Sequence, residues 1–217
     1  MCGRFTLRAP RGHPWLEGVP QDLGAPRYNI APTQQVLLVG QNGEGRRVVR
    51  SAHWGFRPRW LPTGRRAPIN ARADSAADKP MFRKAYQTGR CLVPADGWYE
   101  WQARESGPKQ PYFFHRPDDG VFWLAGLAAR DPQGRATMAI LTTDANAPSA
   151  RVHERMPVVI PDDEAAARWI EPETPEGVLR ELLVPVRDDY IEHYPISRAV
   201  NRPENDNPRI LQRLSED

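Results

Sequence analysis

Short runs of β-prone residues, separated by Gly, Pro or Asn, recur along the chain and constrain its fold more than any other feature. Runs of this length with such boundaries are typical of strands. They cover residues 4–7, 36–39, 48–56, 91–101, 112–115, 121–128, 138–143 and 157–160. Because these runs outnumber the helical signals, the pattern predicts an α+β fold with a mostly antiparallel sheet and peripheral helices.

Three segments carry helical signals. Residues 81–86 end before Gly89, and residues 164–170 follow Asp162 and Asp163, either of which can cap a helix. Residues 178–183 follow Thr174 and Pro175, which we predict to be the N-cap and the first helical residue.

The length of 217 residues fits one domain over residues 1–217, and seven Trp with 40% hydrophobic residues indicate a folded core. Cys2 and Cys91 are the only cysteines, which excludes a disulfide framework and a thiolate metal site and favours a reducing compartment. No run resembles a secretory signal or reaches the length of a membrane span. We therefore expect a soluble, intracellular protein that has no membrane contact.

The basic side of the charge balance is dominated by arginine, since Lys79, Lys84 and Lys109 are the only lysines. Arginine matches phosphate oxygens and stacks on bases, so this composition permits nucleic-acid binding, although GC-rich coding also produces it. Residues 54–66 interleave three aromatic residues with four arginines. Such a segment binds single-stranded nucleic acid in some proteins and is an aromatic strand with a solvated basic loop in others.

Cys2 has unusual chemistry because removal of Met1 would give it a free α-amine. An amine and a thiol on one residue trap an aldehyde: the amine forms an imine, and the thiol then closes a five-membered thiazolidine. Both groups titrate near neutrality, with reference pKa values of about 8 for the amine and about 8.5 for the thiol. The alternative is a frayed terminal residue with no role.

Glu100 is a candidate proton-transfer group because it follows an apolar run and lies between Tyr99 and Trp101. In a strand, both aromatic side chains would point away from the face of Glu100. A carboxylate in a partly dry site has a raised pKa and both donates and accepts protons. A surface Glu on an edge strand fits the same pattern.

His153 and Asn70 complete the set of candidates. His153 precedes a short apolar run beside Arg155 and is a candidate second proton-transfer group. The alternative is a structural or exposed histidine in a loop. Asn70 and Arg72 would present an amide and a guanidinium on one face of an extended segment.

Several long motifs occur along the chain in this order: Met1-Cys2-Gly3-Arg4-Phe5, Tyr28-Asn29-Ile30-Ala31-Pro32-Thr33, Trp54-Gly55-Phe56, Asn70-Ala71-Arg72, Arg90-Cys91-Leu92-Val93-Pro94-Ala95-Asp96-Gly97-Trp98-Tyr99-Glu100-Trp101, His153-Glu154-Arg155-Met156-Pro157 and Ile196-Ser197-Arg198-Ala199-Val200. Motifs of this kind in this order resemble the SRAP (SOS response-associated peptidase) family over residues 2–201. The resemblance implies one SRAP domain with a barrel-like sheet core, followed by a polar C-terminal extension.

The resemblance also implies a sensor of abasic sites in single-stranded DNA that crosslinks itself to the ring-opened deoxyribose. Cys2 matches the crosslinking residue, Asn70 the amide that orients it, and Glu100 and His153 the proton-transfer groups. The positions that line the family's DNA groove are Arg4, Pro32, Trp60, Arg72, Thr142 and Arg155. One departure is Asp74, where the family usually has Glu, which shortens any contact made there.

From this resemblance we expect a monomer that binds single-stranded DNA containing abasic sites, needs no cofactor or metal, and works in the cytoplasm and on the damaged nucleoid. Two other functions stay open on the sequence. One is a cysteine peptidase, including self-processing, with Cys2 as nucleophile and His153 as base. The other is a non-catalytic single-stranded DNA binder, which would bind intact and abasic strands equally.

Overall fold

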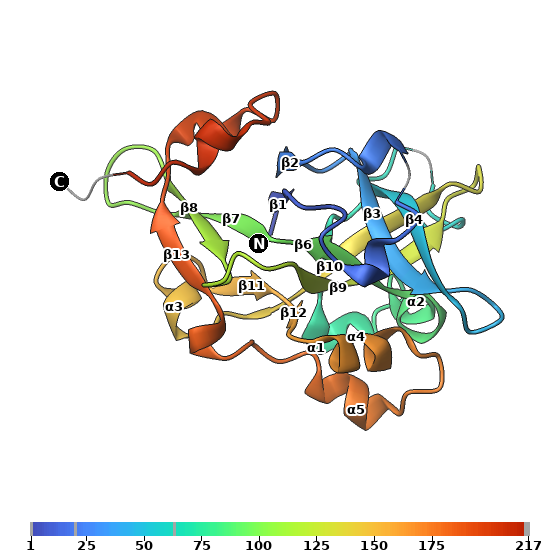
Figure 1. Ribbon diagram of the computed structural model, residues 1–217. Helices are drawn as coiled ribbons and strands as arrows, with labels where there is room; N and C mark the ends of the chain where they lie inside the picture. Colours follow the sequence, from blue (N-terminus) through green and yellow to red (C-terminus); the bar gives the residue numbers. More distant parts are fainter. Residues whose placement is uncertain (1, 20, 63, 215–217) are drawn as a thin grey trace.

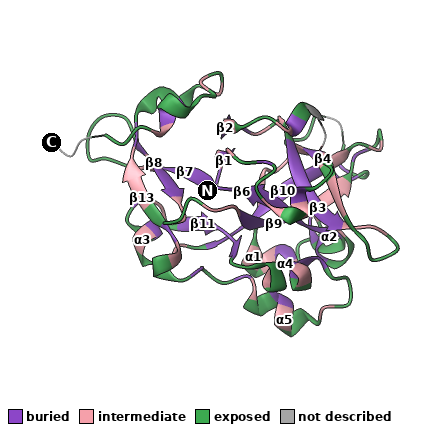
Figure 2. Cartoon of the chain, viewed as in Figure 1, coloured by how far each residue is buried: buried purple, intermediate pink, exposed green. Residues whose placement is uncertain are grey.

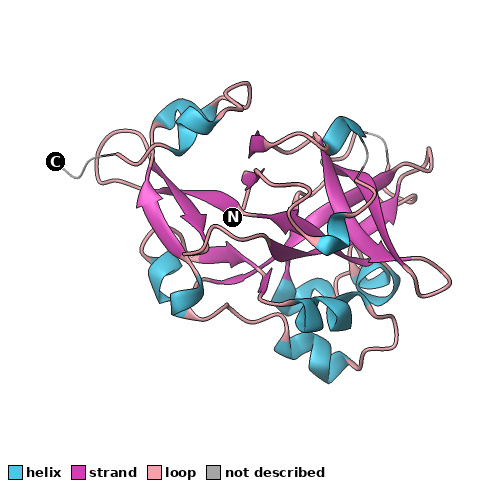
Figure 3. Ribbon diagram, in the orientation of Figure 1, coloured by secondary structure: helices cyan, strands magenta, loops and turns pink. Residues whose placement is uncertain are grey.

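The computed structural model describes residues 2–19, 21–62 and 64–214, and it consists of two β-sheets with short helices around them (Figure 1, Figure 3). One sheet has the order β13 (Glu192–Pro195), β8 (Gln110–His115), β7 (Gly97–Gln102), β1 (Phe5–Leu7) and β2 (Arg27–Ile30). The other has the order β11 (Arg155–Pro157), β10 (Ala136–Asp144), β4 (Arg47–Trp54), β3 (Gln35–Gln41), β6 (Arg90–Ala95), β9 (Phe122–Arg130) and β12 (Val159–Ile160), with β5 (Asn70–Arg72) beside β10.

The second sheet closes on itself, because β10 pairs with β9 as well as with β4. Strands β10, β4, β3, β6 and β9 therefore form a barrel, in which only the β10–β4 pair is parallel. This architecture confirms the predicted α+β fold with a mostly antiparallel, barrel-like core.

Alternation along the barrel strands divides the apolar residues into an inner and an outer set. The inner set includes Leu38, Val93, Leu124 and Ile140. Their immediate neighbours Val39, Leu92, Ala125 and Leu141 belong to the outer set, which packs against the helices. Figure 2 shows the result, with buried residues in the central strands and exposed residues on the loops and helix surfaces.

Helices α1 (Ala73–Ala76), α2 (Arg83–Thr88), α3 (Ala147–Ala150), α4 (Asp163–Ile170) and α5 (Glu176–Glu181) lie outside the barrel. Asp162 is the N-cap of α4 and accepts a hydrogen bond from the Ala165 amide, as one of the two predicted caps should. The predicted start of α5 is wrong by one residue, because Pro175 takes the N-cap position. Thr174 instead donates its hydroxyl to the Arg168 carbonyl at 2.6 Å, which keeps that side chain away from the helix end.

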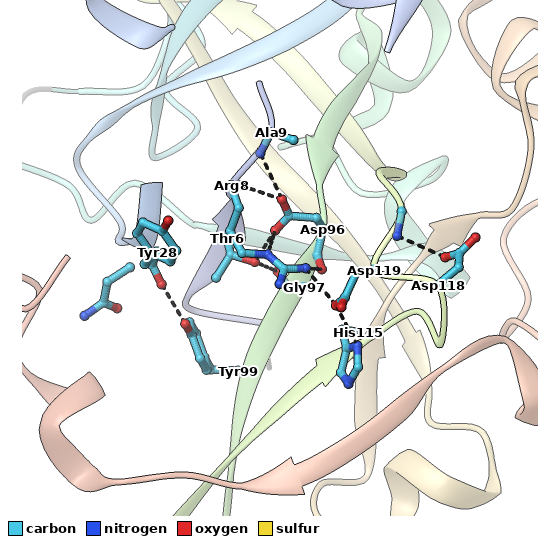
Figure 4. Close-up of polar contacts among 12 residues, drawn as sticks. Thr6, Arg8, Ala9, Tyr28, Asp96, Gly97, Tyr99, His115, Asp118 and Asp119 are labelled. Atoms are coloured by element: carbon cyan, nitrogen blue, oxygen red, sulfur yellow. Dashed lines mark hydrogen bonds and ion pairs between the residues drawn. The ribbon is translucent and has the colours of Figure 1, made fainter. Parts of the chain in front are cut away.

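The predicted strand over residues 91–101 is two strands, because the chain turns at Asp96 between β6 and β7. The Asp96 carboxylate is buried and accepts hydrogen bonds from the Thr6 hydroxyl and the Arg8 amide, both at 2.5 Å, and from the Ala9 amide (Figure 4). A buried carboxylate needs such donors. Their effect is to hold the segment around β1 against the turn between β6 and β7.

The polar segment after β13 is tied to the N-terminal strands. Asn29 on β2 donates its side-chain amide to the carbonyl oxygens of Val200, Arg202 and Asn205 at 2.9–3.2 Å. The backbone amide of Asn29 donates to Asp206 at 2.9 Å. Within the described ranges, no helix is both long and apolar enough to cross a membrane.

Candidate functional site

Cys2 is brought into the protein by the pairing of β1 with β7. Phe5 lies opposite Trp98, and the Tyr99 amide donates to the Arg4 carbonyl at 3.1 Å, so the antiparallel register continues toward Glu100 as the chain approaches Cys2. Figure 1 shows the start of β1 beside β6 and β7 in the middle of the molecule. The Cys2 side chain is fully buried and packs in the inner apolar set. Cys2 is therefore held in place by the fold.

Asn70 orients the backbone of Cys2. Its strand β5 lies parallel to β10, with Asn70 opposite Ile140, and its side-chain amide donates to the Cys2 carbonyl at 2.9 Å. The indole of Trp54 secures the preceding residue by donating to the Ile69 carbonyl at 2.9 Å. The Asn70 Oδ1 atom is buried and accepts no hydrogen bond from the described part of the chain.

Glu100 and the Cys2 thiol influence each other's ionisation. The Glu100 side chain is buried on β7, and burial raises its pKa to about 7. Burial also raises the pKa of the Cys2 thiol, and the nearby Glu100 carboxylate raises it further. At neutral pH the thiol is therefore protonated, whereas Glu100 is divided between its acid and its base form.

His153 lies in the loop between α3 and β11. Its Nδ1 atom accepts a hydrogen bond from the Arg155 amide at 3.0 Å, and its own amide donates to the Ser149 carbonyl at 2.9 Å. Burial lowers the pKa of His153, which favours the neutral ring at pH 7. With Nδ1 acting as an acceptor, the proton of the neutral ring is on Nε2, so His153 is a hydrogen-bond donor.

Arg72, Thr142 and Arg155 lie side by side where β5, β10 and β11 meet. Thr142 pairs with Arg72 across the parallel ladder, and Arg155 donates to the Thr142 carbonyl at 2.6 Å. Two carboxylates neutralise the guanidinium groups: Asp74 bonds Arg72 at 2.5 Å and lies 4.0 Å from Arg155, and Asp144 bonds Arg155 at 2.6 Å. The hydrogen bond from Arg72 lowers the pKa of Asp74 to about 2. A phosphate at this edge would compete with both aspartates.

Comparison with known proteins identifies the family. The profile of the SOS response associated peptidase (SRAP) family matches residues 1–203. This chain belongs to the SRAP family. Abasic site processing protein YoqW of Bacillus subtilis (strain 168) is 34% identical over 224 residues, covering 98% of this chain and 99% of that protein.

Two further comparisons span the chain. Abasic site processing protein YedK of Escherichia coli (strain K12) is 31% identical over 228 residues, covering 98% of this chain and 99% of that protein. A crystal structure of a protein from Bacteroides thetaiotaomicron has a TM-score of 0.84 at 24% identity, covering 99% of this chain and 100% of that one. The sequence-based assignment to the SRAP family and its fold is confirmed.

Arg4, expected from the SRAP motif to line a DNA groove, makes contacts inside the protein. Its guanidinium donates to Asn29 Oδ1 at 2.8 Å and to the carbonyl oxygens of Val200 and Asn201 at 2.6 and 3.1 Å. These bonds attach the segment after β13 two residues away from Cys2. The structure therefore gives Arg4 a structural role. Its contact with DNA stays a prediction.

Pro32 and Trp60 occupy different surroundings. Pro32 lines a cavity of about 470 Å³ that also includes Ile69, the residue before Asn70. Trp60 is 57% exposed and lies at another cavity, of about 470 Å³, lined by Phe56, Lys84 and barrel residues. Of the predicted DNA-binding residues, only Arg72, Thr142 and Arg155 thus form one cluster.

Lys109, which no sequence motif indicated, acts on the site through its charge. It is exposed just before β8, and its positive charge lowers the pKa of both Glu100 and His153, although burial has the larger effect on each. The Gln102 side chain ties this β7–β8 hairpin to the His153 loop by donating to the Arg151 carbonyl at 2.7 Å. An isolated lysine in a polar loop gives no local signal of such a position.

The site offers no evident metal centre. In the part of the chain that the structure describes, no group of three or more His, Cys, Asp and Glu side chains is placed to hold an ion. The chemistry available here comes from a thiol, a carboxyl group, an imidazole and an amide.

Proposed function

We propose that this protein processes abasic sites in single-stranded DNA by forming a thiazolidine crosslink between Cys2 and the ring-opened deoxyribose. The observation that carries the proposal is the burial of Cys2 beside Glu100, a carboxyl group with a pKa of about 7, under the Asn70 amide. The names of the relatives YoqW and YedK, abasic site processing proteins, support the same substrate.

The reaction requires removal of Met1, which lies outside the described residues. The free Cys2 amine adds to the C1′ aldehyde to give a carbinolamine, and Glu100 in its acid form donates the proton with which the hydroxyl group leaves as water. The iminium that this step leaves keeps the proton on its nitrogen. Glu100, now a carboxylate, accepts the thiol proton while the Cys2 sulfur attacks the iminium carbon. Glu100 thereby regains its acid form, and a neutral thiazolidine forms with the loss of one water in total.

The raised pKa of the Cys2 thiol explains why a base is needed at this step. A buried thiol that stays protonated at neutral pH reacts only when a neighbouring group accepts its proton. A carboxyl group whose pKa lies near the working pH serves well as both acid and base. Glu100 has that pKa because it is buried.

His153 has a complementary role in this proposal. Its neutral ring, with the proton on Nε2, would donate a hydrogen bond to the sugar oxygen when the deoxyribose ring opens. Arg72, Thr142 and Arg155 would hold the flanking phosphate by exchanging their bonds to Asp74 and Asp144 for bonds to the strand.

The electrostatics argue against a cysteine peptidase mechanism. Such a mechanism relies on a thiol with a depressed pKa beside a protonated histidine. Here burial raises the pKa of the Cys2 thiol and lowers that of His153, so the ion pair is disfavoured. A plain single-stranded DNA binder, in turn, would gain nothing from a buried carboxyl group beside a thiol.

The test is a denaturing gel and an intact-mass measurement after incubation with a uracil-containing single strand that has been treated with uracil glycosylase. We expect a heat-stable adduct whose mass equals the protein without Met1 plus the abasic strand minus one water. Cys2→Ala should abolish the stable adduct, because an alanine amine forms only an imine. Cys91→Ala, which removes the other buried cysteine, is the matched control and should retain it.

An undiminished, heat-stable adduct from Cys2→Ala would refute the thiazolidine. If the wild type binds intact and abasic strands equally and forms no adduct, the plain binder is the better interpretation.

A further inference from the structure

The end of the barrel away from Cys2 is open. Strand β10 passes Ala136 first and reaches Ile140, beside Asn70, four residues later, a distance of about 13 Å along the strand. Cys2, Phe5 and Trp98 pack against the inner set of residues at the Ile140 end, whereas Ala136 lines a cavity of about 470 Å³ at the other. We call this cavity the barrel mouth.

Small inward-facing residues keep the barrel mouth open. Gly40, Ala128 and Ala136 line it, on three different barrel strands. The Cys2 end is filled by large side chains, among them Trp54 and Trp98, both fully buried. Packed residues such as Met138 separate the two ends. The barrel mouth is therefore a site distinct from the candidate catalytic centre.

The charges around the barrel mouth all have the same sign. Arg50, Arg59, Lys84, Arg90 and Arg130 line it, and no Asp or Glu does so among the described residues. The Arg90 guanidinium is used inside the protein, where it donates to the carbonyl groups of Tyr86, Trp169 and Glu171. The structure records no side-chain hydrogen bond or ion pair of Arg50, Arg59 or Lys84 with any described residue, and the Arg130 guanidinium donates only to the Gly134 carbonyl, at 2.7 Å. Like charges gathered without counter-ions favour the binding of an anion.

The barrel mouth also has a large apolar part. Leu38, Val48, Phe56 and Met81 supply apolar side chains to its lining. Trp60 stands at the edge with 57% of its side chain exposed, the largest fraction among the exposed large hydrophobic residues described. A free indole face beside unpaired cations is the combination that stacks a nucleobase and binds its phosphate. The volume lies within the range of about 300–1,000 Å³ that is usual for small-molecule sites.

We propose that the barrel mouth binds a nucleotide unit, with the base stacked on Trp60 over the apolar surface and the phosphate held by Arg50, Arg59 and Lys84. The nucleotide unit can be a free mononucleotide or an undamaged nucleotide within a bound DNA strand. Binding of a strand nucleotide rests on the proposed function, whereas binding of a free mononucleotide does not.

The free nucleotide is tested by NMR titration of the labelled protein with dAMP, deoxyadenosine and inorganic phosphate. We expect dAMP to shift the Trp60 indole resonance and to bind more tightly than either fragment. Arg50→Ala with Lys84→Ala should weaken binding by about tenfold, about threefold for each exposed cation. Arg83→Ala is the matched control, because it removes an exposed cation of α2 that does not line the barrel mouth, and it should bind dAMP as the wild type does.

The strand source is tested with intact oligonucleotides of 5 and 15 nucleotides, measured by fluorescence anisotropy, so that crosslinking plays no part. If dAMP does not bind but the double variant loses affinity for the longer strand alone, the nucleotide comes from the strand. The proposal is overturned if neither dAMP nor the longer strand depends on Arg50 and Lys84, or if inorganic phosphate binds as tightly as dAMP. A failure here leaves the abasic crosslink intact, since that is measured by the covalent adduct.

Discussion

Replacing Glu100 with glutamine removes a carboxyl group that the fold keeps out of water, and the effect should have opposite signs on catalysis and on stability. As an acid and base in the crosslinking reaction, Glu100 is expected to contribute about 10²–10⁴-fold to the rate. Glutamine keeps the shape of the side chain but transfers no proton. Single-turnover crosslinking, followed on denaturing gels from pH 5 to 9, should show this loss together with the disappearance of the bend in the wild-type profile near pH 7.

The stability effect follows from the raised pKa. Glu100 has a folded-state pKa of about 7 against an ordinary value of 4.5, so the folded state keeps a proton that the unfolded state releases. Its favourable contribution is fully present below about pH 4.5 and is lost as the pH rises through 7. At about 1.4 kcal/mol per pKa unit, the unfolding free energy of the wild type falls by about 3 kcal/mol as the pH rises through this range because Glu100 ionises. Glu100→Gln does not ionise and avoids this loss.

Urea unfolding at pH 4.5 and pH 8 measures this difference directly. The variant should gain about 3 kcal/mol relative to the wild type between the two pH values. Glu105→Gln, an exposed carboxylate in the loop after β7, is the control and should show no comparable gain. If the difference in unfolding free energy between Glu100→Gln and the wild type is the same at both pH values, burial does not raise the pKa of Glu100. The proposed acid–base role of Glu100 then loses its basis.

Four further predictions concern the surroundings of Cys2 and the contacts with DNA. Lys109→Gln should move the pH–rate profile toward higher pH, because removing the positive charge raises the pKa of Glu100 and His153, and the shift should shrink in high salt. Asn70→Ala loses the 2.9 Å bond to the Cys2 carbonyl and should slow crosslinking by about 10²-fold while binding of intact single strands, measured by anisotropy, stays unchanged. Arg72→Ala should reduce the salt slope of strand binding by about 0.7. Trp60→Ala should weaken binding at every salt concentration by about 1–3 kcal/mol, and a change in slope alone would place the strand elsewhere.

Some of the fold follows from local pattern. Alternation in runs such as 36–39 and 138–143 predicts strands with two apolar faces, and the structure uses one face inside the barrel and the other under the helices. The cap of α4 at Asp162 is equally local, since the side chain bonds an amide three residues away. These features are readable because the interacting groups are neighbours along the chain.

Other features depend on groups that are distant in sequence. The break at Asp96 arises because Thr6 and Arg8 supply the donors that a buried carboxylate needs, about 90 residues away. Strand β5 has only three residues, too few for a pattern, and exists because β10 offers it an edge. Arg4 was expected at a DNA surface, yet its guanidinium donates hydrogen bonds to the carbonyl groups of Val200 and Asn201.

The sequence by itself determined the chemistry of the candidate site: a cysteine behind a removable methionine, a carboxyl group between aromatic residues, a histidine and an amide in motifs of the SRAP family. It also determined the strand-rich class of the fold, because alternation and strand boundaries are local properties. Only the tertiary structure decided that Glu100 titrates near neutrality and that Cys2 stays protonated, because both pKa values depend on how much water the packed barrel excludes. It also decided that unpaired cations from β4, α2 and the Trp60 loop surround one open end of the barrel, because strand pairing alone brings those distant residues together.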